Sequence, residues 1–206
     1  MKRLLAVIFL LLTTLPALQA QKRFYLFPSF QEAHISFINR SEADVPLNFD
    51  ALGQTIYYYD GDTLMELVNP ELIREVLVDG RRFVMREGKF CEAVRRESGN
   101  VLVNWKFKHV NVGSKGALGA TTQAKVEVLN ARSDDVDEIW TLKNENTYFF
   151  RVGERECSAR RLKDLYKAFP AQSARLKAYA RENKLMMTNA EEAFLLIDRL
   201  RALAAE

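Results

Sequence analysis

Hydrophobic residues between positions 33 and 159 recur at every second position, in short runs that are separated by turn residues. This period of two puts alternate side chains on opposite faces, so each run predicts a β-strand. Asp60-Gly61-Asp62 and Asp79-Gly80 supply typical hairpin turns. Because few helical periods lie between the runs, the pattern favours an antiparallel meander over a doubly wound parallel sheet. The predicted strands are 33–39, 45–49, 55–59, 63–68, 72–78, 81–86, 89–95, 101–109, 121–129, 138–142, 148–152 and 156–159.

The strand predicted at 101–109 shows the clearest alternation. One side is expected to be buried and the other to face water. The side expected to be buried carries Val101, Val103, Trp105, Phe107 and His109.

Beyond Gly153 the hydrophobic period changes to about 3.6, which predicts helices. Pro170 ends the first helix, and the second is predicted at 171–184. Thr188 and Glu191 fit a capping box for the third. The predicted fold class is therefore α+β, with a mostly antiparallel β domain at 33–159 and a helical segment at 160–206 that packs on it. The inward-facing helical residues are Leu162, Leu165, Tyr166, Phe169, Leu176, Tyr179, Ala180, Phe194, Ile197 and Leu200.

The first twenty residues have the pattern of a secretory signal peptide. Lys2 and Arg3 precede the apolar run Leu4–Leu12, which is shorter than the roughly 20 residues that span a bilayer. A small residue, Ala20, stands at the expected cleavage position. We expect an exported chain, periplasmic or associated with the outer membrane, with no transmembrane segment after cleavage and any membrane association only through a partner.

Charge argues against nucleic acid as a ligand. The formal net charge is +3, and loss of Lys2 and Arg3 reduces it to about +1. The remaining basic residues are scattered among acidic ones, whereas nucleic-acid binding needs a clustered basic face.

Cys91 and Cys157 both fall in predicted strands. An exported protein can join two such residues in a disulfide, provided that the strands bring the Cα atoms within about 7 Å. The alternative is two buried free thiols that behave as small hydrophobic side chains.

The sequence contains no recognisable catalytic or metal-binding constellation. Its two histidines, His34 and His109, both lie in predicted strands. Two His and two Cys without short paired spacing do not form a typical zinc site, and the loop Gly113–Gly119 lacks a following helix that could hold a phosphate. No cofactor and no metal are expected. The available carboxylates lie in predicted turns: Asp60, Asp62, Asp134, Asp135, Asp137 and Glu138.

In the last third of the chain a short hairpin precedes two helices with a distinctive residue pattern. The pattern resembles that of uncharacterised exported proteins of Bacteroidota-type Gram-negative bacteria. This resemblance implies an envelope location and a β-rich body with a helical tail, and it implies no reaction. The matching residues are Lys163, Asp164, Leu165, Phe169, Pro170, Leu176, Lys177, Ala178, Tyr179, Asn183, Lys184 and Leu185.

Two clusters of aromatic residues make a candidate interaction surface. One lies in the N-terminal aromatic segment 21–32, and the other is the run Tyr57-Tyr58-Tyr59, which puts rings on both faces of a strand. Packing within the same molecule explains them as well. Thr63, in Asp62-Thr63-Leu64, resembles an O-glycosylation acceptor of these bacteria, and a hairpin turn is the alternative. The candidate surface comprises Phe24, Tyr25, Phe27, Phe30, Tyr57, Tyr58 and Tyr59.

Three functions are compatible with these features. The first is a non-enzymatic structural or protein-interaction protein of the cell envelope, with an envelope protein as its partner. The second is a binding module for a lipid or other apolar ligand held between sheet and helices. The third is a carbohydrate-active enzyme that uses the acidic turns, with Asp60 and Asp135 as its candidate carboxylates.

Overall fold

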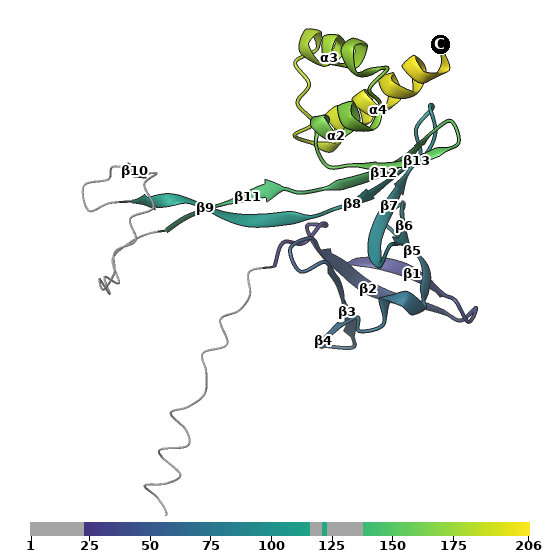
Figure 1. The fold of residues 1–206 in the computed structure, drawn as a ribbon. Coiled ribbons are helices and arrows are strands. Elements are labelled where there is room, and N and C mark those ends of the chain that lie inside the picture. The colour runs from purple at the N-terminus through teal and green to yellow at the C-terminus, as the bar shows by residue number, and fades with distance from the viewer. Residues whose placement is uncertain (1–22, 116–120, 123–137) are drawn as a thin grey trace, which may run out of the picture.

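The computed structural model describes residues 23–115, 121–122 and 138–206 of the 206-residue chain (Figure 1). Within these residues the fold is α+β, as predicted: a large antiparallel sheet of ten strands, a second sheet of three strands and three C-terminal α-helices. The signal-peptide prediction at 1–20 lies outside the described residues.

The strands agree closely with the predicted positions. Most differ from the prediction by one to three residues at an end, where the hydrophobic pattern fades into turn residues. A 3-10 turn, η2, spans Pro70–Leu72. The strands are β1 Gln31–Phe37, β2 Glu42–Asp50, β3 Thr55–Asp60, β4 Thr63–Glu66, β5 Ile73–Val78, β6 Arg81–Arg86, β7 Lys89–Val94, β8 Val101–Asn104, β9 Phe107–Lys115, β10 Thr121–Thr122, β11 Glu138–Asn144, β12 Thr147–Val152 and β13 Arg155–Ala159.

The large sheet joins two meanders side by side. Its strand order is β13-β12-β8-β7-β6-β5-β1-β2-β3-β4. β1 lies between the two meanders, because Ile35 pairs with Ala43 of β2 on one side and with Val76 of β5 on the other. β4 and β13 are therefore the two edges of the sheet.

The sheet encloses two hydrophobic cores. The first lies on the inner face of β1–β7 and includes Leu47, Val76 and Phe83. The second lies between the helices and strands β8, β12 and β13, and includes Tyr148 and Ile197. Trp105 packs against both cores. The two halves of the molecule are thus joined both by one continuous sheet and by a shared side chain.

The single strand predicted at 101–109 was wrong, because the chain changes partners at Trp105 and Lys106. The Lys106 N–H donates to Asn146 Oδ1 at 2.8 Å, and the Phe107 N–H donates to the Ala51 carbonyl at 3.0 Å. The chain therefore leaves the large sheet after β8 and continues as β9, which pairs with β11 in the second sheet. Figure 1 shows β9 and β11 extending away from the body as a two-stranded arm.

The helices are α2 Leu162–Ala168, α3 Ser173–Glu182 and α4 Ala190–Ala205, and they lie over β12 and its neighbours (Figure 1). The predicted capping box at Thr188 and Glu191 was displaced by one residue. The N-cap is Asn189, whose Oδ1 accepts from the Glu192 N–H at 2.9 Å. None of the described helices combines the length and the apolar character that a membrane span requires.

α4 also holds the connection between β7 and β8. The Arg201 guanidinium donates to the Gly99 carbonyl at 2.9 Å and to the Asn100 carbonyl at 2.7 Å. Gly99 has φ 126°, and a Cβ at this position would lie 3.4 Å from Arg201 Cζ. Arg96 pairs with Asp198 at 2.8 Å. These contacts, which we call the Arg201 joint, link the last helix to the connection between β7 and β8, where the first core gives way to the second.

Candidate interaction surface

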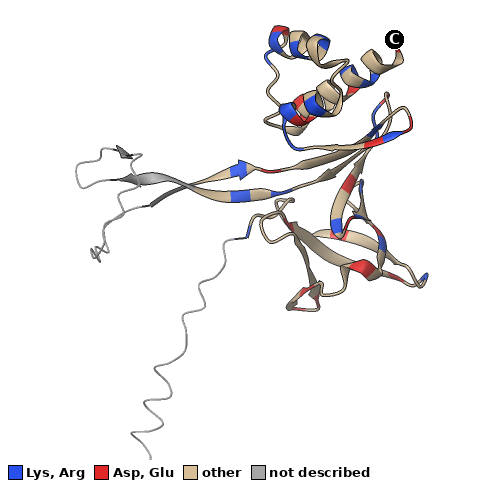
Figure 2. Cartoon of the chain, in the orientation of Figure 1, with Lys and Arg blue, Asp and Glu red and all other residues tan. Residues whose placement is uncertain are grey.

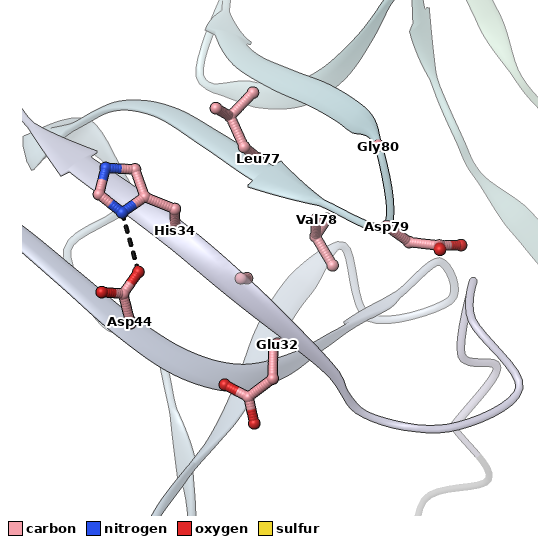
Figure 3. A pocket seen from close by; sticks show the side chains of 8 residues that line it. Glu32, His34, Asp44, Leu77, Val78, Asp79 and Gly80 are labelled. Atoms are coloured by element: carbon pink, nitrogen blue, oxygen red, sulfur yellow. Dashed lines mark hydrogen bonds and ion pairs between the residues drawn. The ribbon is translucent and has the colours of Figure 1, made fainter.

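The outer face of strands β1, β2 and β5 carries a groove of about 450 Å³ (Figure 3). The alternation that buries Ala33 and Ile35 inside the sheet points the intervening His34 outward. Asp44 lies directly opposite His34 on β2, and Leu77 lies opposite it on β5. The groove is lined by Glu32, Ala33, His34, Asp44, Leu77, Val78, Asp79 and Gly80.

Carboxylates dominate the electrostatics of this groove. His34 Nδ1 lies 2.8 Å from Asp44 Oδ1, and its Nε2 lies 3.8 Å from Glu42 Oε2. The hydrogen bond to Asp44 is the main reason that the pKa of His34 lies above its ordinary value of 6.5. The lining combines carboxylates with one imidazole and contains no hydroxyl or thiol side chain. Its negative charge suits binding of a cation.

Four of the predicted aromatic residues gather on the outer face, beside this groove. The Tyr25 ring lies 5.4 Å from Phe30 and 6.3 Å from Tyr57, and Phe30 lies 4.7 Å from Tyr59. All four are half-buried. They form one platform that joins the N-terminal segment to β3.

The other three predicted aromatic residues pack elsewhere. Phe27 is only 3% exposed and belongs to the first core, so its assignment to an interaction surface was wrong. Phe24 packs against Phe107 with ring centroids 4.7 Å apart, and Tyr58 packs against the first core from β3. These residues anchor the N-terminal segment to the sheet.

The guanidinium of Arg23 packs on this aromatic platform. The Arg23 guanidinium carbon lies 4.2 Å from the centre of the Tyr57 ring. Tyr57 Oη also donates to Glu66 Oε2 at 3.3 Å. The contact is a cation–π interaction next to a carboxylate, which is the environment that a basic side chain of a partner would meet.

The acidic character extends along the whole stretch 41–73, which contains seven Asp and Glu residues and no Lys, Arg or His. Asp50 is the buried member of this set, and its Oδ1 accepts from the Phe24 N–H at 3.0 Å. The net charge of the whole chain hides this stretch, whereas a count over a local window reveals it. The seven are Glu42, Asp44, Asp50, Asp60, Asp62, Glu66 and Glu71.

Exposed apolar side chains border the same stretch. β4 is an edge strand, and its Leu64 and Met65 are 36% and 40% exposed. Val68 and Leu72 follow it and are more exposed still. Edge strands are usually protected by charged side chains, proline, a bulge or short length. β4 has four residues and carries Glu66 but neither Lys nor Pro. It therefore leaves a short edge that an extended basic chain can pair with.

The remaining predicted residues lie apart from this surface, with the exception of Thr63. Cys91 on β7 and Cys157 on β13 are free thiols, separated by β8 and β12, so the disulfide is not formed. Three strand spacings amount to about 14 Å, which is far beyond disulfide reach. Thr63 is exposed at the start of β4, and its glycosylation stays a prediction.

The acidic turns do not form one site in the described residues. Asp60 and Asp62 are exposed at the turn between β3 and β4, whereas Asp134, Asp135 and Asp137 lie outside the described residues. His109 is half-buried on β9, opposite Leu142. Within the parts of the chain that are described, no group of three or more His, Cys, Asp or Glu residues could hold a metal ion.

Fully buried side chains fill the space between sheet and helices, where a lipid ligand had been predicted as an alternative. Leu176, Leu196, Ile197 and Leu200 each have 0% exposure there.

Comparison with protein-family models, curated proteins and solved structures finds no match.

Proposed function

We propose that the protein is an exported, non-enzymatic interaction protein of the cell envelope that binds a basic, extended segment of a partner protein. The binding surface is the acidic outer face of β1–β4, together with the β4 edge. The observation that carries this proposal is the stretch 41–73, with seven acidic residues and no basic residue, next to exposed apolar side chains.

Three features support a basic partner. The carboxylates of this face, among them the exposed Asp60 and Asp62, steer a cationic chain toward the face and disfavour acidic competitors. Tyr57 and Tyr59 offer ring faces to guanidinium or ammonium groups, as Arg23 already shows. The free edge of β4 offers backbone N–H and C=O groups to an added strand, while Leu64 and Met65 receive its apolar side chains.

Binding of synthetic peptides tests the proposal. A peptide of alternating Val and Lys should bind and should shift the NMR amide signals of β3 and β4. A peptide of alternating Val and Glu should not. The affinity should fall with added salt, because the attraction is largely electrostatic. Equal binding of both peptides, or amide shifts confined to the helices, would overturn the proposal.

Two variants locate the site. Asp62→Lys together with Glu66→Lys should weaken binding of the Lys peptide at least tenfold, because two carboxylates beside β4 become cations. The matched control is Glu154→Lys together with Glu182→Lys, at exposed positions outside this face. The control variant should bind like the unmodified protein.

A further inference from the structure

A second groove, of about 340 Å³, lies between α2 and α3 on the helical side of the molecule. Its floor is apolar and combines Leu162 and Tyr166 of α2 with Ala180 of α3. Its rim is basic, and no carboxylate lines it. The complete lining is Leu162, Tyr166, Lys177, Ala180, Arg181, Lys184, Leu185 and Met186.

The basic residues lie on α3 and just after its end. Lys177 and Arg181 are four residues apart on one face of α3, and Lys184 follows in the loop after Glu182. All three are exposed, and among the described residues none of them pairs with a carboxylate. The Lys177 ammonium instead lies 5.1 Å from the centre of the Tyr166 ring. Three like charges in a row repel one another until an anionic partner neutralises them.

The end of the groove is built by a fixed loop. Met186 is 73% exposed, yet its backbone N–H donates to Glu192 Oε2 at 3.0 Å. The same oxygen accepts from the Thr188 N–H at 3.0 Å. Lys184 has φ 54°, a left-handed conformation at a position after a helix where glycine is usual. The loop therefore exposes the side chains of Met186 and Lys184 to solvent, while the hydrogen bonds to Glu192 fix its backbone.

We propose that this groove binds an acidic amphipathic helix of a partner protein. A helix that lies between α2 and α3 would place its apolar stripe on Leu162, Tyr166 and Met186. Acidic residues along one side of that helix would then lie opposite Lys177, Arg181 and Lys184. This surface is distinct from the acidic face of β1–β4, and the inference does not depend on the function proposed for that face.

Fluorescence anisotropy with labelled peptides provides the test. The probe is an amphipathic peptide of about 18 residues, long enough to form a helix, with a leucine stripe flanked by glutamates at i, i+4 and i+7. The unmodified protein should bind it, and Arg181→Glu should weaken binding at least tenfold. The matched control Lys167→Glu makes the same charge change on an exposed α2 residue outside the groove lining, and should bind normally.

Two further measurements use a peptide of opposite charge and lipid vesicles. Arg181→Glu should gain affinity for the same peptide with lysines in place of its glutamates, which a merely unfolded variant would not do. Met186→Gln should weaken binding of the Glu peptide without changing its salt dependence. The proposal is overturned if the Glu peptide does not bind, if Lys167→Glu weakens binding as much as Arg181→Glu, or if only vesicles of phosphatidylglycerol bind in an Arg181-dependent way.

Discussion

At the scale of single residues, Arg201 ties the last helix to β12 and to the connection between β7 and β8. Its side chain is 10% exposed and donates to Arg151 O at 2.8 Å and to Ser98 Oγ at 2.9 Å, in addition to the carbonyls of Gly99 and Asn100. A planar guanidinium can reach several acceptors at once, whereas an ammonium is a single point donor.

Arg201→Ala should therefore lower the free energy of unfolding by about 2–4 kcal/mol, because the substitution removes a largely buried charged side chain and all of its hydrogen bonds. Arg201→Lys should recover only part of this loss. Urea denaturation measures both variants. Arg175→Ala, which removes an exposed ion pair with Glu206, serves as the control and should cost less than about 1 kcal/mol. Equal costs for Arg201→Ala and Arg175→Ala would contradict the role of the joint.

His34 should respond to pH in a defined direction. Its pKa is raised in the folded state, mainly by the hydrogen bond to Asp44, so the protonated pair stabilises the fold at acidic pH. That contribution is fully present below the ordinary value of 6.5 and is lost as the pH rises through the raised pKa. NMR titration should show the pKa of His34 fall in Asp44→Asn. An unchanged pKa in that variant would show that Asp44 is not the cause.

The same proton affects the proposed binding of a basic segment. Protonated His34 repels a cationic partner, so the affinity for the Val-Lys peptide should increase as the pH rises through the pKa of His34. The variant His34→Gln should lack this increase.

The two thiols should differ in reactivity. Burial raises the pKa of Cys91 to about 12, and its side chain is 0% exposed. Cys157 is half-exposed, and burial raises its pKa as well. Iodoacetamide should modify Cys157 slowly and leave Cys91 intact in the native protein, as mass spectrometry would show. Prior denaturation should expose both, and modification of native Cys91 would contradict its burial.

At the scale of elements, the β9–β11 arm pairs like charges. Lys108 on β9 lies directly opposite Lys143 on β11, and both are exposed. Opposed like charges destabilise an antiparallel pair, and an isolated two-stranded ribbon is marginally stable by itself.

Lys143→Glu should strengthen this pair by up to about 1 kcal/mol, which corresponds to roughly fivefold slower amide exchange in the described part of the arm. Lys143→Gln removes the repulsion without adding an attraction and should give an intermediate rate. Hydrogen exchange with mass spectrometry measures both. No change in either variant would indicate that the two ammonium groups do not interact.

Local patterns were enough to predict most elements, because strand alternation and helical periods depend on neighbouring residues. The break at Trp105 and Lys106 was not predictable in this way. It depends on Asn146 and Ala51, which come from distant parts of the chain. The same limit applies to the surface. The run of three tyrosines at 57–59 was expected to put rings on both faces of a strand. The contacts of Tyr57 with Tyr25 and of Tyr59 with Phe30 depend on how the N-terminal segment continues along β2, which the local pattern does not show.

At the scale of the whole molecule, charge is distributed unevenly between the β1–β4 region and the β9–β11 arm. Figure 2 shows acidic segments over β1–β4 and basic segments on β9 and β11, while the helices carry both signs. The two proposed binding surfaces lie on different halves and differ in sign. If both proposals hold, a basic partner and an acidic partner would bind to opposite halves of one molecule.

The two cores should unfold together, because the β7–β8 pairing, Trp105 and the Arg201 joint link them. Ile73→Ala in the first core and Ile197→Ala in the second should each cost roughly 2–5 kcal/mol. Both should shift one common transition in urea, seen equally by circular dichroism and by hydrogen exchange in each half. Two separate transitions in either variant would contradict the coupling.

The hydrogen bonds of Arg201 to residues 98–100 can form only late in synthesis, because Arg201 lies near the C-terminus of the chain. Strands β1–β7 can pair as soon as residue 94 is available, because their partners are all earlier in the chain. The hydrogen bonds to residues 98–100 form only when Arg201, about a hundred residues later, has left the ribosome. During that interval β7 is paired with β6 and β8, but the other neighbour of β8, which is β12, and the helices that cover β8 are still to come. The nascent chain is thus most vulnerable to mispairing at β8, and a chaperone would protect it best there.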